Sequence, residues 1–122
     1  MHPVIETPSY LGDLNSAGVT IEGAARIVAI IASDPEAGDL IVGTGGARKV
    51  RIGGRGKGKS GGYRVVTYYA AKEVPAFALI SKGERADLSQ AERNALKAEL
   101  ASLADDYRAG LAAKVNKLRT SP

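Results

Sequence analysis

The sequence contains no cysteine and a single histidine, His2, among its 122 residues. The absence of cysteine excludes disulfide bonds, thiolate metal sites and cysteine nucleophiles. One histidine near the start of the sequence provides neither a pair of imidazoles for acid–base catalysis nor a ligand set for zinc. We therefore expect no metal and no cofactor, and any catalysis has to use arginine, lysine, tyrosine or carboxylate side chains.

Long apolar runs are also missing. No stretch approaches the roughly 18 apolar residues that a membrane-spanning helix needs, and residues 1–16 lack the apolar centre of a secretory signal. Hydrophobic residues make up 44% and charged residues 25% of the chain, as in an ordinary globular protein. We expect a cytoplasmic protein with a single domain over residues 1–122, in which residues 1–20 and 109–122 are less firmly ordered.

The positive charge of the chain is concentrated in one window. Residues 48–64 hold seven basic residues, no acidic residue and six glycines, whereas the rest of the chain has ten basic and 13 acidic residues. A concentrated positive field with little side-chain bulk suits close approach to a phosphate backbone. A flexible, solvated hairpin loop is the alternative interpretation. The basic residues are Arg48, Lys49, Arg51, Arg55, Lys57, Lys59 and Arg64.

The apolar pattern predicts an α+β fold with N-terminal helices, a small antiparallel sheet and a C-terminal helix packed on one face of the sheet. Residues 3–6 fit a brief edge strand and residues 10–15 a short helix. A helix capped by Thr20 is expected to bury Ile21, Ala25, Val28 and Ile31 and to end before Pro35. The helices should cover one face of the sheet and leave the other to basic residues.

Three strands are expected, over residues 47–52, 63–70 and 75–81, joined as an antiparallel meander. In the first of them the two-residue period directs Val50 and Ile52 to the core and Lys49 and Arg51 to the open face. Ser89 and Glu92 form a capping box for the last helix. Its apolar stripe is core or a groove that faces a partner, and the helix either ends at Gly110 or continues toward residue 118. The stripe comprises Leu96, Leu100, Leu103 and Tyr107.

Residues 53–60, GGRGKGKS, match the phosphate-binding loop pattern G-x-x-x-x-G-K-[ST] letter for letter. In such a loop the last residues enter a helix whose backbone N–H groups hold the phosphates. Here a strand pattern follows from residue 63. The match therefore does not indicate nucleotide hydrolysis.

Several segments occur in an informative order: DPEAGD (34–39), GTGGARKVR (43–51), the basic glycine loop, GGYRVVTYY (61–69), and FALISKGERADLS (77–89) before the capped helix. In this order they resemble the RelE/ParE superfamily of type II toxins, in particular its HigB-like branch. The resemblance implies a ribosome-dependent mRNA endonuclease that works without metal and directs the ribose 2′-OH onto the adjacent phosphate. The implied partners are the ribosome, its mRNA, and a cognate antitoxin of the helix-turn-helix type.

The resemblance also implies roles for individual residues. Lys49 and Arg51 match the alternating basic pair of the family, Arg64 its phosphate-clamping arginine, and Lys82, just past the third predicted strand, its last basic position. These four are the candidate catalytic residues. A tyrosine that related enzymes carry shortly afterwards is replaced by the stretch 86–88, so no residue is assigned to proton transfer. The candidate RNA-binding residues are Arg48, Arg55, Lys57, Lys59, Tyr68 and Arg85.

Each of these assignments has an alternative. Lys49 and Arg51 could be the polar side of an amphipathic strand, Lys82 an ordinary lysine after a strand, and Tyr68 a sheet-packing residue. At the level of the whole protein, a ParE-like poison of DNA gyrase and a non-catalytic RNA- or ribosome-binding module are the alternatives to the endonuclease. The binding module would use the same basic face as the endonuclease.

Overall fold

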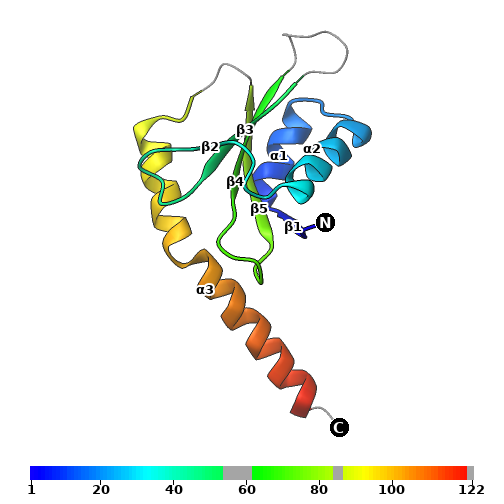
Figure 1. Ribbon diagram of the computed structural model, residues 1–122, viewed down its shortest axis with the longest axis vertical. Helices are drawn as coiled ribbons and strands as arrows, with labels where there is room; N and C mark the ends of the chain where they lie inside the picture. The colour runs from blue at the N-terminus through cyan, green and yellow to red at the C-terminus, as the bar shows by residue number, and fades with distance from the viewer. Residues whose placement is uncertain (54–61, 84–86, 121–122) are drawn as a thin grey trace.

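A five-stranded sheet lies between two helices on one side and a single long helix on the other (Figure 1). The computed structural model describes residues 1–53, 62–83 and 87–120, and for residues 112–120 the course of the helix without its side chains. The elements are, in chain order, β1 (Val4–Glu6), α1 (Pro8–Ser16), α2 (Ile21–Ser33), β2 (Asp39–Leu40), β3 (Arg48–Ile52), β4 (Tyr63–Tyr68), β5 (Ala76–Gly83) and α3 (Gln90–Thr120). This is the predicted α+β class.

The strands are arranged in the order β1-β5-β4-β3-β2. Strands β3, β4 and β5 form the predicted antiparallel meander, and β2 adds to it by pairing antiparallel with β3. The edge strand β1, in contrast, pairs in parallel with β5, with Val4 opposite Ala76, so the sheet is mixed. No hairpin joins β1 to β5, and its direction is therefore free of the constraint that a short connection imposes.

Side-chain caps begin all three helices. The hydroxyl of Thr7 accepts a hydrogen bond from the Tyr10 N–H at the start of α1, and Thr20 accepts one from the Gly23 N–H at the start of α2. In α3 the predicted capping box is present: the Ser89 N–H donates to Glu92 Oε1 at 2.9 Å. The Glu92 N–H donates to Ser89 Oγ at 3.1 Å. The helix continues to Thr120, so Gly110 does not end it.

The buried face of α2 differs from the predicted one. Ile27 and Ile31 are each 1% exposed, whereas Ile21, expected in the core, is 88% exposed. Ala24 packs against the same core, so the stripe follows residues 24, 27 and 31. Apolar residues occupy most positions of this helix, and the periodicity could not distinguish between neighbouring stripes.

Both faces of the sheet are covered by helix, which corrects the expectation that one face would be left to basic residues. The core on the first face joins α1 and α2 to the strands, through Tyr10, Leu14, Ile27, Ile31, Val50, Ile52, Val65, Ala76 and Ala78. The core on the second face joins α3 to the strands, through Ala47, Val66, Val74, Phe77, Leu79, Leu96 and Leu100.

The central strand β4 shows why both faces are covered. Val65 faces the first core and Val66 the second, and both are almost fully buried. Such continuous apolar runs are typical of strands covered on both faces. None of the helices in the described ranges is both long enough and apolar enough to cross a membrane.

Candidate active site

Three cationic side chains stand side by side across the central strands. Arg51 of β3 is directly opposite Arg64 of β4, and Arg64 is directly opposite Lys82 of β5. Paired residues on adjacent strands are about 5 Å apart at Cα and point to the same face, which here is the face of α3. Like charges in direct opposition destabilise a sheet. We therefore regard this cation row, Arg51–Arg64–Lys82, as a feature that folding alone does not explain.

Lys49 extends the row along the same face. It is opposite Val66, and it precedes Arg51 by one two-residue period, about 7 Å along the strand. Val50 and Ile52, between and after them, are 6% and 3% exposed and belong to the first core. The predicted division of β3 into a core side and a cationic side is therefore confirmed.

Lys82 lies within a strand, and the expectation that it follows the strand is wrong. β5 continues to Gly83, because its last residues pair with the beginning of β4. A register shift between Val66 and Thr67 lets this end of β5 stay aligned with β4. The strand position fixes Lys82 beside Arg64.

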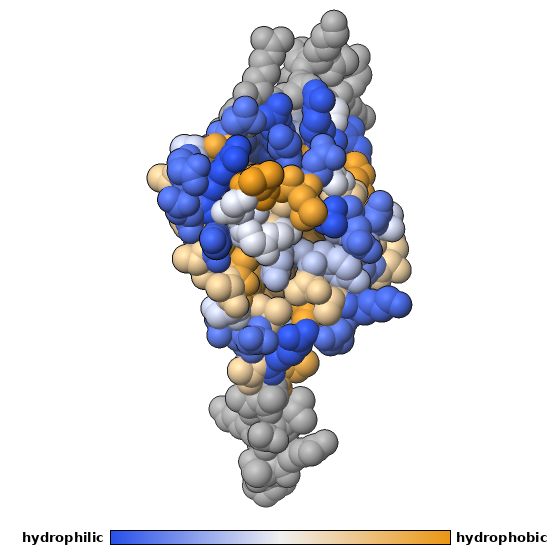
Figure 2. Space-filling view, turned by 60° about the vertical axis from the view of Figure 1, so that its left-hand side comes forward, coloured by the Kyte–Doolittle hydropathy of each residue, from blue (hydrophilic) through white to orange (hydrophobic). Residues whose placement is uncertain are grey.

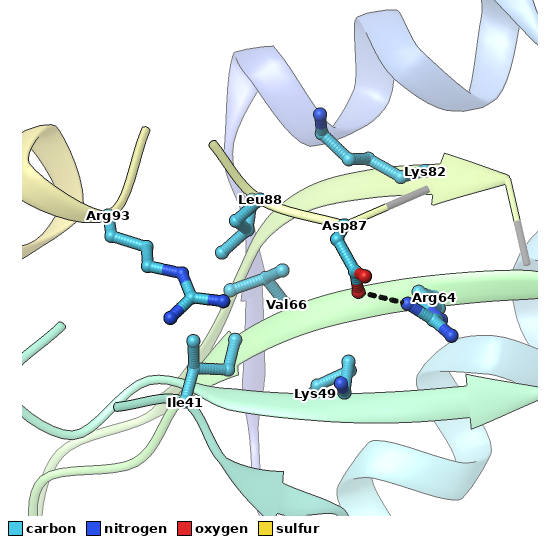
Figure 3. A pocket seen from close by; sticks show the side chains of 8 residues that line it. All are labelled: Ile41, Lys49, Arg64, Val66, Lys82, Asp87, Leu88 and Arg93. Carbon is cyan, nitrogen blue, oxygen red and sulfur yellow. Dashed lines mark hydrogen bonds and ion pairs between the residues drawn. The ribbon is translucent and has the colours of Figure 1, made fainter. Parts of the chain in front are cut away.

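The central arginine of the row is bound by a carboxylate from the segment that leads into α3. Arg64 Nη1 donates to Asp87 Oδ1 at 2.5 Å, and the two side chains are 19% and 72% exposed (Figure 3). An ion pair with so exposed a carboxylate contributes only about 0–1 kcal/mol to stability. A phosphate that can also contact the neighbouring cations would be a stronger partner than this single carboxylate.

Lys82 is bound to the cap of α3. Its Nζ lies 2.8 Å from Glu92 Oε2 and donates to Oε1 at 3.0 Å. The hydrogen bond from Lys82, followed by that from the Ser89 N–H, holds the pKa of Glu92 below its usual value. Lys82 therefore also fastens the first turn of α3 to β5, a structural role in addition to the predicted catalytic one.

A hollow borders the cation row (Figure 3). Its charged end contains Lys49, Arg64, Lys82 and Asp87, and its other end is formed by Ile41, Val66, Leu88 and Arg93. Sequence reasoning did not select Ile41, Leu88 or Arg93 for this site. The apolar stripe of α3 was the available signal, because Arg93 precedes the buried Leu96 by three residues and Leu100 by seven and therefore lies on the same side of the helix.

Two of the predicted RNA-binding residues lie away from the row. Arg48 has the opposite orientation to Lys49, and its Nη1 donates to the Gly38 carbonyl at 3.3 Å. Tyr68 packs, half-buried, against the second core, and its ring is next to Gly46. Arg55, Lys57, Lys59 and Arg85 lie outside the described residues.

The structure around residues 53–60 agrees with the interpretation that they are not a phosphate-binding loop. The element that follows residues 53–60 is strand β4, and a phosphate-binding loop requires a helix there. Within the part of the chain that the structure describes, no three side chains of histidine, cysteine or carboxylate type are placed to hold a metal ion. The charged side chains that line the hollow are Lys49, Arg64, Lys82, Asp87 and Arg93.

A family model, that of the RelE toxin of the RelE / RelB toxin-antitoxin system, matches residues 24–120. The match begins in α2 and ends with α3, and it includes the whole cation row, Lys49, and the hollow beside them. It covers about four fifths of the sequence. The resemblance to the RelE/ParE superfamily is thereby confirmed.

Proposed function

The chain belongs to the RelE toxin family, and from this premise we propose that it cleaves mRNA in the ribosomal A site. In this reaction the ribose 2′-oxygen bonds to the adjacent phosphorus and the bond from phosphorus to the 5′-oxygen breaks. The 2′-OH loses its proton, and the departing oxygen gains one. Negative charge accumulates on the non-bridging oxygens of the pentacovalent phosphorus in the transition state, and fixed cations stabilise it.

The observation that carries the proposal is the position of Arg64 between Arg51 and Lys82. Guanidinium groups bind phosphate oxygens in a planar, bidentate geometry, and a lysine adds a point charge. In the free protein the Asp87 carboxylate occupies Arg64, and in the complex a phosphate of the mRNA takes its place. Lys49 supplies a further charge at the edge of the same site.

A cognate antitoxin is the partner that membership of a toxin–antitoxin family implies. We propose that it is of the helix-turn-helix type, and that the protein acts in the cytoplasm on translating ribosomes. The assignment to the HigB-like branch is part of the same proposal. It is supported by the stretch Ala86-Asp87-Leu88, which lacks the tyrosine of better-known relatives.

We also propose that the chain is one toxin domain over residues 1–122. Residues 1–23 precede the matched range, but β1 pairs with β5, and Tyr10 and Leu14 of α1 belong to the first core. This packing ties the start of the chain to the sheet that carries the cation row.

The test is expression of the protein in bacteria, followed by primer-extension mapping of cellular mRNA. We expect codon-phased cuts in translated messages and none in a matched transcript without a start codon. Arg64→Ala should remove the cuts. Intact mRNA with blocked replication would contradict the proposal in favour of a gyrase poison, and RNA binding without cuts would favour a binding module.

A further inference from the structure

The hollow beside the cation row has two ends of different chemistry. Its charged end is described above; the other is aliphatic and consists of Ile41, Val66 and Leu88. Val66 is 3% exposed and forms the floor, and Ile41 and Leu88 are partly exposed above it. The residues on either side of Ile41 are also apolar: Val42 is 82% exposed, and Leu40, 62% exposed, pairs with Arg48 and so points to the other side of the sheet. Hydrophobic residues form a patch within a hydrophilic surround on the side of the molecule shown in Figure 2.

Arg93 borders this aliphatic end. It comes from the first turn of α3, and its guanidinium extends toward Ile41 and Val66 (Figure 3). Its Nη1 donates to the Val42 carbonyl at 3.5 Å, a long contact that fixes the group only loosely. The guanidinium is planar and lies beside aliphatic side chains. In RNA-binding proteins such planar groups stack on nucleobases.

The two ends are separated by about the length of one nucleotide. Arg64 and Val66 point to the same face and are one two-residue period apart, about 7 Å along the strand. The enclosed part of the hollow measures about 20 Å³, enough for about one water molecule. A planar ligand therefore lies against the surface, as on the stacking platforms of single-strand binders, and not inside a cavity.

We propose that the aliphatic end is a nucleobase subsite, in which a base packs on Ile41 and Leu88 against the Arg93 guanidinium while its phosphate lies on Arg64. The inference deepens the proposed function, since it takes mRNA as the substrate. Arg93 becomes a residue that positions the nucleotide, and it adds affinity that depends on the base. The alternative occupant, an acidic and apolar segment of a protein partner, is an outcome of the test.

The test is an NMR titration of the full chain with adenosine 5′-monophosphate and, separately, with ribose 5-phosphate. Both ligands carry the phosphate, and only the first carries a base. We expect the nucleotide to bind about two- to fivefold more tightly, the gain typical of an exposed guanidinium on a π-system. It should also shift the methyl signals of Ile41 and Leu88, which ribose 5-phosphate should leave in place.

Three variants and one control variant separate the contributions of the base and the phosphate. Arg93→Ala should remove the difference between the two ligands, and so should Arg93→Lys, which keeps the charge but loses the flat guanidinium. Arg64→Ala should weaken both ligands equally. Arg108→Ala, the matched control, removes a charge at the other end of the α3 side, where Arg108 pairs with Glu73. It should leave both affinities unchanged.

Equal affinities for the two ligands in the wild type would overturn the inference. So would a base-dependent gain that survives in both Arg93 variants, or methyl signals of Ile41 and Leu88 that respond to purified antitoxin and not to the nucleotide. The outcome is separate from that of the mRNA mapping. If mRNA is cleaved but the base adds no affinity, the subsite proposal alone is wrong. If the base adds affinity but mRNA is not cleaved, the endonuclease proposal alone is wrong.

Discussion

The two faces of the sheet use the same strands but differ in how completely a helix covers them. On the α1–α2 face, buried apolar residues continue along the strands, from Ala76 and Val65 to Ile52. On the α3 face, apolar residues such as Phe77 give way to the cation row where α3 begins. The first core thus extends along the whole length of these strands, whereas the second stops at the cation row, the place where the proposed function puts the RNA phosphate.

Polar groups on the two faces differ in the same way. On the first face Asp13 Oδ2 accepts a hydrogen bond from the Ser81 N–H at 2.9 Å, which ties α1 to β5. Burial, followed by the nearby charge of Glu6, raises the pKa of Tyr10 to about 12, so its hydroxyl stays neutral. On the second face, Asp87 and Glu92 bind cations that an anionic ligand also attracts. Ion pairs therefore distinguish the polar groups of the second face from those of the first.

The largest effect is expected when the second face loses its central cation. Arg64→Ala should lower the rate of mRNA cleavage about 100- to 1,000-fold, because one fixed charge on the transition state is removed. The thermal midpoint should change little, since the carboxylate of the ion pair that is lost is 72% exposed. Primer extension and thermal unfolding measure the two quantities. Equal loss of cleavage in Arg108→Ala would show that total charge, and not position, governs activity.

Cavity substitutions should separate the two cores. Ile27→Ala on the first face should lower the free energy of unfolding by about 3 kcal/mol, as is usual for deletion of a buried aliphatic side chain. Leu100→Ala on the second face should release α3 locally. Native-state hydrogen exchange measures this, and we expect faster exchange in α3 while β4 stays protected. Uniform acceleration across β4 and α3 in both variants would mean that the two cores unfold as one unit.

The cap of α3 should stabilise the protein in a pH-dependent way. Ser89→Ala should cost about 1 kcal/mol, a thermal shift of about 4 °C. The pKa of Glu92 is lowered in the folded state, chiefly by Lys82. The ionised Glu92 side chain therefore stabilises the folded state above the usual pKa of glutamate, about 4.3. This stabilisation is lost as the pH falls through the lowered pKa.

The measurement for Glu92 is the thermal midpoint of wild type and Glu92→Gln from pH 7 to pH 3. The wild type should be the more stable at pH 7, and the difference should disappear in acid. Glu99→Gln, a charge removal farther along α3, is the matched control. A difference between wild type and Glu92→Gln that grows as the pH falls would contradict the assignment.

The smallest effect is expected from the carboxylate on Arg64. Asp87→Asn should raise the affinity for inorganic phosphate or a short RNA a few-fold, because the ligand no longer competes with a charge already on the site. Isothermal titration calorimetry at low salt measures this affinity. Asp105→Asn is the control, because it removes an exposed carboxylate from a different ion pair. Unchanged affinity in Asp87→Asn would show that the carboxylate does not occupy the phosphate position.

Much of the local structure could be predicted from the sequence. The strand alternation of Val50 and Ile52 against Lys49 and Arg51 and the capping box of α3 follow from chemistry within a few residues. The buried stripe of α2 could not be predicted, because apolar residues surround most of that helix. The parallel pairing of β1 could not be predicted either, since no short connection constrains it.

The sequence by itself determined which residues are cationic, which of them alternate on a strand, and that catalysis would have no cysteine and no pair of histidines to use. Only the tertiary structure decided that Arg51, Arg64 and Lys82 form one row and that Asp87 and Arg93 border it. The physical reason is that sheet register and the position of α3 depend on contacts between segments far apart in the chain. No local pattern encodes which carboxylate or aliphatic side chain comes to lie beside a given arginine.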